Sequence, residues 1–142
     1  MEWSGIMPAI TTKFTSDDKL DLELFNKNLE FQLKSGIQAI VLAGSLGEAS
    51  TLSRDEKNIL TKNTVEFVDD KIPVVVNIAE QSTKEALESV KCAEKYGASG
   101  LMVLPPMRYK SGRNETISYF ENNKIKSVNI SNQNLSFDKS TV

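Results

Sequence analysis

Four short apolar runs that are rich in β-branched residues constrain this chain more than any other feature of its sequence. They cover residues 6–11, 39–43, 74–78 and 101–104, and longer segments with helical spacing of apolar residues separate them. Apolar residues on consecutive positions are typical of strands buried on both faces, as in parallel sheets. The pattern therefore predicts βα units and an α/β fold built on a parallel sheet.

The segments between these runs carry the residues with which helices begin and end. The first segment has apolar residues on one stripe at helical spacing: Leu22, Phe25, Leu29 and Leu33. Gly36 follows this stripe and predicts a left-handed residue that ends the helix. Ser53 with Glu56, and Ser82 with Glu85, have the spacing of capping boxes and predict two further helix starts.

The helix that begins near Ser82 is expected to run to about Tyr96 and to stop at Gly97. Its spacing turns small and apolar side chains toward the sheet: Ala86, Val90 and either Cys92 or Ala93. Cys92 is then most simply a small buried apolar residue without a reactive role.

Charge and composition exclude several classes of function. Lys and Arg total 17 against 19 Asp and Glu, and the net charge of −2 argues against a nucleic-acid or anionic membrane surface. The absence of histidine excludes Ser-His and Cys-His catalysis and zinc sites built on imidazole, so we expect no metal site. Proton transfer falls to carboxylates, Lys, Tyr, hydroxyls or water. The single cysteine and the lack of a signal peptide or a long apolar stretch predict a cytoplasmic protein.

The segment after the second run, residues 44–53, is the first of two unusual loops at predicted strand ends. Parallel α/β folds collect their sites at the carboxyl ends of strands. Gly44 and Gly47 let the backbone approach a ligand, Ser45 adds a hydroxyl, and backbone amides can point at a carboxylate or phosphate. The alternative is a tight turn in which both glycines serve only dihedral angles and Glu48 bonds nearby backbone.

The second unusual loop, residues 105–112, follows the fourth run. Arg108 and Tyr109 are candidates for substrate contact, and a Pro-Pro turn with a solvated Arg-Tyr-Lys segment is the alternative. Glu80, after the third run, is a candidate acid or base, although an exposed loop carboxylate is the commoner outcome.

The composition changes after Phe120. Residues 121–142 are rich in Asn and Ser, lack Gly, Pro and Ala, and show no sustained helical stripe. We therefore expect one domain at residues 1–120 and a poorly ordered tail at residues 121–142.

Four segments stand in a distinctive order along the chain: residues 7–14 with Asp21 shortly after, 44–53, 72–76 and 97–106. Together they resemble the first half of the dihydrodipicolinate synthase and N-acetylneuraminate lyase family, and the resemblance covers roughly residues 3–120. It implies the N-terminal half of a (β/α)8 TIM barrel, in a family that is commonly homotetrameric. It also implies a lyase that forms a Schiff base between a lysine and the keto group of pyruvate or another 2-oxo acid, without a cofactor.

The same resemblance assigns roles within the first loop. By this resemblance, the Ser45 hydroxyl binds the substrate carboxylate and relays a proton, and the Leu46 amide donates a second hydrogen bond to the carboxylate. Neutral donors in a partly closed barrel mouth suit a small carboxylate. Met107 stands where dihydrodipicolinate synthases carry a relay tyrosine, with Tyr109 shortly after it. The expected substrate-binding residues are Gly44, Ser45, Leu46, Gly47, Glu48, Met107 and Tyr109.

Departures from the family concern its catalytic groups. Leu46 stands where the family often has a second hydroxyl, and the thioether of Met107 cannot pass protons. The family's Schiff-base lysine and its tyrosine at the end of the fifth strand lie beyond the part that this sequence matches. Lysines of the matching part fall on predicted helix surfaces or in a loop: Lys84, Lys91, Lys95 and Lys110. Since a nucleophilic lysine needs burial at the floor of a pocket, we expect a truncated lyase that is inactive alone.

Half a barrel leaves two sheet edges unpaired and its strands without their opposite wall. An alternative function is therefore a non-catalytic interaction module, or a half barrel that pairs with itself or with a separately encoded second half. A third option is a flavodoxin-like open sheet, although the loops offer neither an Asp pair nor a Gly-rich phosphate cradle. The expected partners are a small 2-oxo acid and a second copy or second half, with neither nucleic acid nor membrane.

Overall fold

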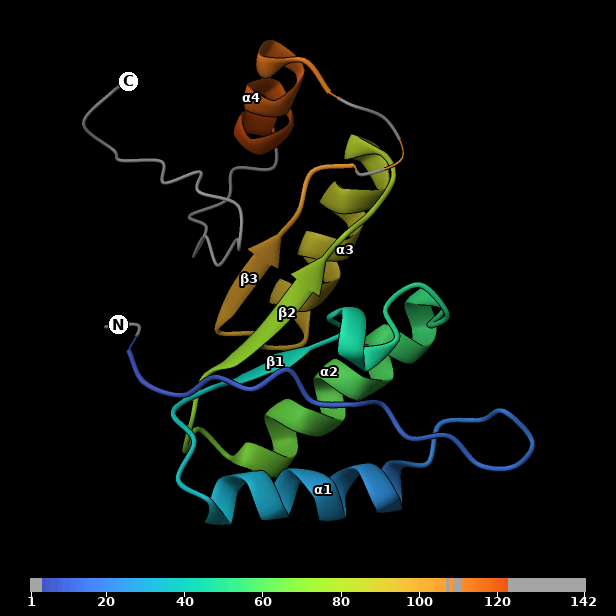
Figure 1. Ribbon diagram of the computed structural model, residues 1–142, viewed down its shortest axis with the longest axis vertical. Helices are drawn as coiled ribbons and strands as arrows, with labels where there is room; N and C mark the ends of the chain where they lie inside the picture. Colours follow the sequence, from blue (N-terminus) through green and yellow to red (C-terminus); the bar gives the residue numbers. More distant parts are fainter. Residues whose placement is uncertain (1–3, 107, 109–110, 123–142) are drawn as a thin grey trace.

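A computed structural model describes residues 4–106, 108 and 111–122 of the chain. Its centre is a three-stranded parallel sheet in the order β1-β2-β3, with bounds Ile40–Leu42, Val74–Ile78 and Gly100–Val103. Helices alternate with the strands (Figure 1): α1 (Leu22–Lys34), α2 (Arg54–Val68), α3 (Thr83–Lys95) and α4 (Arg113–Asn122), with the short 3-10 helix η1 (Ser45–Gly47) after β1. The predicted α/β architecture of parallel βα units is therefore confirmed.

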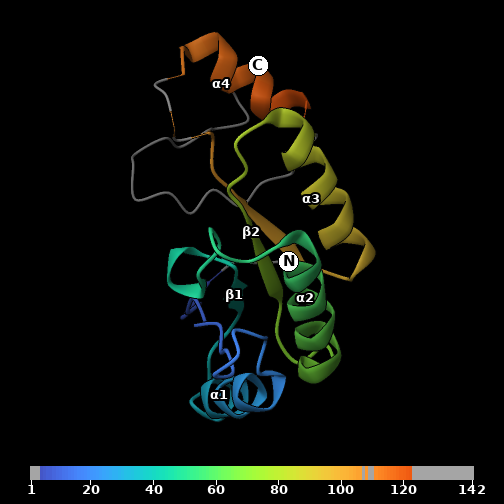
Figure 2. The ribbon, with the colours of Figure 1, turned by 90° about the vertical axis from the view of Figure 1, so that its right-hand side faces the viewer.

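The core lies between the sheet and its helices. Helices α2 and α3 both contact β2, and Figure 2 shows them on the same side of the sheet. Alternate strand residues belong to this core: Ile40, Leu42, Val74, Val76 and Ile78. Every residue of β1 and β2 is buried, as predicted for strands covered on both faces. Three of the four residues of β3 are only half-buried, because within the described chain no strand pairs with its outer edge.

The first predicted strand, residues 6–11, is not a strand of this sheet. Only Ala9 pairs with Val41, as an isolated parallel bridge. The Val41 amide donates to the Pro8 carbonyl at 2.9 Å, and the Ile10 amide donates to the Val41 carbonyl at 3.0 Å. The ladder does not extend further because Pro8 has no N–H to donate and Ala43, at φ +50°, leaves the extended conformation. The segment lies beside β1, but the regular strand predicted for residues 6–11 is not formed.

The predicted helix ends are confirmed. Gly36 and Gly97 adopt φ values of +78° and +85° immediately beyond α1 and α3. Ser53 and Glu56 form both bonds of the capping box at the start of α2. At α3, Ser82 accepts a hydrogen bond from the Glu85 amide. Between the two candidates for the sheet-facing position of α3, Ala93 is buried and Cys92 is half-buried.

The predicted tail at residues 121–142 falls outside the described residues from residue 123 onward, so its order stays a prediction. Among the helices of the described ranges, none combines the length and the apolar character that crossing a membrane requires.

Candidate functional site

The loop after β1 is a compact turn at the carboxyl end of that strand. The Gly47 amide donates to the Gly44 carbonyl at 2.9 Å, and the Glu48 amide donates to the Ser45 carbonyl at 3.2 Å. Ala43 at φ +50° precedes the turn, and Glu48 at φ +58° ends it. Neither loop glycine has a positive φ, since the left-handed positions belong to Ala43 and Glu48. The alternative in which both glycines serve only dihedral angles is therefore wrong.

Close packing explains one of the two glycines. A Cβ on Gly47 would lie 3.0 Å from the Ile10 carbonyl oxygen, whereas a Cβ on Gly44 would meet only the Ala9 side chain, at an ordinary 3.7 Å. The Thr12 hydroxyl donates to the Gly47 carbonyl at 2.7 Å, and both residues are buried. Sequence reasoning missed Thr12, whose signal was a hydroxyl at the end of the first apolar run. These contacts hold the loop against the N-terminal segment.

The tip of this loop presents hydrogen-bond donors to solvent. Ser45 and Leu46 are exposed, and the Ser45 hydroxyl has no hydrogen bond within the described residues. The amides of Ser45 and Leu46 open the 3-10 turn and have no carbonyl partner in the described chain. Glu48 is also exposed, and its carboxylate bonds no described backbone group, contrary to the tight-turn alternative. Neutral donors of this kind are able to bind a small carboxylate.

Asn77 holds the other end of the loop. It is the polar residue of β2, it is 4% exposed, and its Nδ2 donates to the Ala43 carbonyl at 2.8 Å. Sequence reasoning missed this residue as well, although a single amide within a run of Val and Ile was a visible signal. Thr12 and Asn77 therefore hold the loop from two different elements.

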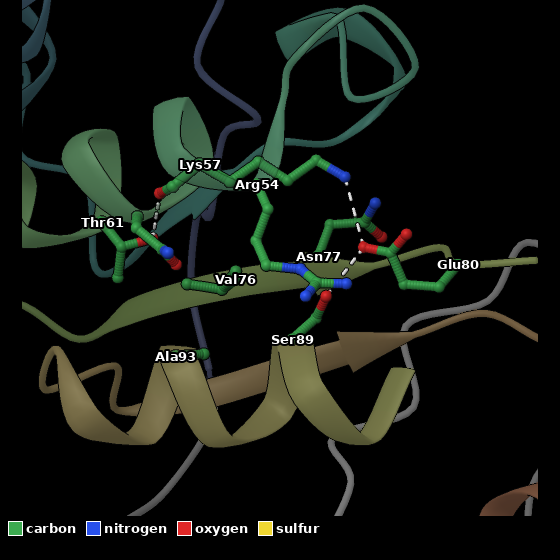
Figure 3. A pocket seen from close by; sticks show the side chains of 9 residues that line it. Arg54, Lys57, Thr61, Val76, Asn77, Glu80, Ser89 and Ala93 are labelled. Atoms are coloured by element: carbon green, nitrogen blue, oxygen red, sulfur yellow. Dashed lines mark hydrogen bonds and ion pairs between the residues drawn. The ribbon is translucent and has the colours of Figure 1, made fainter. Parts of the chain in front are cut away.

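Glu80 lies in a polar cluster between α2 and α3 (Figure 3). Its Oε1 accepts from Lys57 Nζ at 3.2 Å and from the Ser89 hydroxyl at 2.9 Å. The side chains of Lys57 and Glu80 are 19% and 20% exposed, so the expectation of an exposed loop carboxylate is wrong. The adjoining cavity measures about 10 Å³, which holds one water molecule and no substrate. Glu80 thus connects α2 and α3 through its hydrogen bonds to Lys57 and Ser89.

A second cavity, of about 230 Å³, lies between the start of α3 and α4. Hydroxyl groups and one carboxylate provide its polar lining: Ser82, Thr83, Ser111, Glu115, Thr116 and Tyr119. Burial, and then the charge of Glu80, raise the pKa of Tyr119 to about 12, so its hydroxyl stays protonated at neutral pH. Arg108 is exposed, while Met107 and Tyr109 fall outside the described residues, and their expected contact with substrate stays a prediction.

None of the lysines in the described ranges is fully buried. Lys84, Lys91 and Lys95 are exposed on α3, as predicted, and Lys57 is half-buried in its pair with Glu80. Lys110 falls outside the described residues. No group of His, Cys, Asp or Glu within the described ranges is arranged to hold a metal ion.

Comparison with known proteins gives consistent matches. A model of the dihydrodipicolinate synthetase family matches residues 2–129. The 4-hydroxy-tetrahydrodipicolinate synthase of Thermotoga petrophila is 41% identical over 102 residues, which cover 72% of this chain and 34% of that protein.

Solved structures agree with the sequence matches. The dihydrodipicolinate synthase of Thermotoga maritima has a TM-score of 0.78 at 37% identity, over 82% of this chain and 39% of that one. A prophage protein of the dihydrodipicolinic acid synthase family from E. coli K12, solved in complex with pyruvate, has a TM-score of 0.82 at 29% identity, over 85% of this chain and 41% of that one. The chain therefore spans between 34% and 41% of the length of these relatives.

Proposed function

Because the chain belongs to the dihydrodipicolinate synthetase family, we propose that it supplies the carboxylate-binding part of a barrel lyase that acts on pyruvate or a related 2-oxo acid. In this proposal Ser45 donates its hydroxyl to the substrate carboxylate and the Leu46 amide provides a second donor. The observation that carries the proposal is the set of unpaired donors on a loop whose ends are both held by buried hydrogen bonds. A relative of similar fold was solved with pyruvate bound, which supports the choice of ligand.

The uncharged donors at the tip of the loop suit this ligand, and the one charged side chain of residues 44–48 is the exposed Glu48 carboxylate. A carboxylate accepts hydrogen bonds only, so it needs donors and no competing acceptors at the point of contact. A hydroxyl and backbone amides satisfy it without the desolvation cost of a buried cation. The same hydroxyl is able to pass a proton to a neighbouring group, which is the second role that we propose for Ser45.

We further propose that these 142 residues do not form the Schiff base themselves. Imine formation needs an unprotonated amine, and burial is what lowers the pKa of a lysine enough to provide one. The described lysines are exposed, apart from Lys13 and Lys57, which are half-buried, and Lys57 is engaged with Glu80. In this proposal a second half of the barrel supplies the imine-forming lysine and the relay tyrosine of the family, and the present residues alone are inactive.

Pyruvate titration followed by amide NMR of the uniformly labelled chain tests the binding role. We expect shifts at Ser45 and Leu46 that saturate, that weaken at least about fivefold in Ser45→Ala, and that persist in Ser50→Ala, an exposed serine of the same segment. Pyruvamide, which lacks the carboxylate, should not produce them. Equal binding of pyruvamide, or shifts elsewhere, would reject a carboxylate site at this loop.

Borohydride reduction in the presence of pyruvate tests the second part. The intact mass of the chain should stay unchanged, since none of the described lysines lies in a buried pocket that would activate its amine. A covalent pyruvate adduct on any lysine would show that the chain carries its own nucleophile.

A second candidate function is a half barrel that pairs with another copy or with a separate second half. The half-buried strand β3 favours it, because no strand of the described residues pairs with its outer edge, which is therefore open to a further strand. Sedimentation velocity at micromolar concentration tests it. A compact monomer with a cooperative melt would speak against pairing through this edge.

A further inference from the structure

Asn77 is a buried amide that uses only part of its hydrogen-bonding capacity. The other residues of β2 are Val74, Val75, Val76 and Ile78, and the whole strand is buried. Nδ2 of Asn77 donates to the Ala43 carbonyl at 2.8 Å, whereas its buried Oδ1 has no partner among the described residues. A buried acceptor without a donor destabilises the folded chain relative to an aliphatic side chain of similar size. Packing of the strand alone therefore does not explain an amide at this position.

The group that Asn77 does engage is strained. Ala43 has φ +50°, a left-handed conformation that costs energy for any residue with a Cβ and that persists only where its surroundings impose it. Ala43 directly precedes the loop, and Ser45 lies two residues on, at most about 7.6 Å away between Cα atoms. The Asn77 hydrogen bond thus acts on the residue that sets the direction in which the chain enters the loop.

The two ends of the loop are held differently. Thr12 binds the Gly47 carbonyl from the N-terminal segment, while Asn77 binds the Ala43 carbonyl from the neighbouring strand. The bonds inside the turn join only loop residues to one another, so they do not orient the turn relative to the sheet. Figure 3 shows Asn77 beside Lys57 and Glu80, the pair whose contact joins the segment after β2 to α2.

We propose that Asn77 is a positioning residue for the carboxylate-binding loop. Its carboxamide holds Ala43 in the left-handed conformation and thereby orients the donors of Ser45 and Leu46. This inference rests on the proposed function for the ligand, but its effect on the loop is measurable without one. The unmet Oδ1 is the structural cost of keeping the Nδ2 donor at this position.

Replacement of Asn77 by Leu separates positioning from general stability. In Asn77→Leu we expect little net change in stability to urea, because removal of the unpaired Oδ1 offsets the loss of the donor to the buried Ala43 carbonyl. Exchange of the Gly47, Glu48 and Ala49 amides should nevertheless become roughly fivefold to tenfold faster, and pyruvate binding should weaken by a similar factor. Val75→Ala, at a fully buried position of the same strand, should lose stability while the loop amides and pyruvate binding keep their wild-type behaviour.

The outcomes distinguish this inference from the proposed function. Faster loop exchange in Asn77→Leu, together with no pyruvate response in the wild-type chain, would support the positioning role and reject the carboxylate site. Pyruvate binding by the wild-type chain with unchanged loop exchange and affinity in Asn77→Leu would overturn the inference. If Asn77→Leu does not fold, Asn77→Ala removes the carboxamide without added bulk, and the same two readouts apply.

Discussion

Replacement of Thr12 by valine should destabilise the chain by about 2 kcal/mol, within a range of about 1–3 kcal/mol. Valine matches the shape of threonine, so no cavity forms and the change removes the hydroxyl alone. The lost bond is the 2.7 Å contact between Thr12 Oγ1 and the Gly47 carbonyl. Both residues are buried, and within the described chain no backbone amide donates to that carbonyl. The substitution therefore leaves a buried carbonyl without a hydrogen-bond donor, and the folded chain bears the full desolvation penalty of that group.

A second threonine provides the matched control. Thr64 is fully buried in α2, and its hydroxyl donates to the Leu60 carbonyl at 2.8 Å. That carbonyl also accepts the helical bond from the Thr64 amide, so Thr64→Val leaves no group unpaired. We expect Thr64→Val to stay within about 0.5 kcal/mol of the wild type.

Urea unfolding of both variants, followed by circular dichroism, measures the difference. Thr12→Val should also speed amide exchange in residues 47–49, whereas Thr64→Val should not. Equal destabilisation by the two substitutions, or a Thr12→Val variant as stable as the wild type, would refute the claim that this hydroxyl anchors the loop.

Two further predictions concern helix ends. Gly36→Ala and Gly97→Ala each place a Cβ at positive φ, and each should destabilise the chain by about 1 kcal/mol. Gly97→Ala should lower the Tm further, because its Cβ would lie 3.2 Å from Val65 Cγ1, whereas nothing lies within 4 Å of a Cβ at Gly36. Equal Tm values for the two variants would contradict this. Hydrogen bonds from the Ser53 hydroxyl, and then from the Ser53 amide, hold the pKa of the Glu56 carboxylate below its ordinary 4.5. The ionised carboxylate therefore stabilises the folded chain at neutral pH, and this contribution is lost as the pH falls below 4.5 through the folded-state pKa. Urea unfolding from pH 7 to pH 2.5 should show a smaller acid-side loss for Glu56→Gln, and an identical loss would count against the capping carboxylate.

Much of the fold was predictable because its signals are local. Capping residues mark where α2 and α3 begin, left-handed glycines follow the ends of α1 and α3, and each of these signals acts within a few residues. Consecutive apolar residues indicated β1 and β2 as buried strands. The irregular first segment also had a local cause, since Pro8 removes a ladder donor, and weighting that proline more heavily would have predicted it.

The amino-acid sequence by itself determined the order of the βα units and marked the loop at Gly44–Glu48 as a candidate site. Only the tertiary structure decided what holds that loop, because Thr12 and Asn77 reach it across 35 and 34 residues of sequence. Contacts of that range depend on the register of the sheet and on which side chains its packing brings together. Periodicity and capping signals describe neighbours along the chain, so they carry no information about these two bonds.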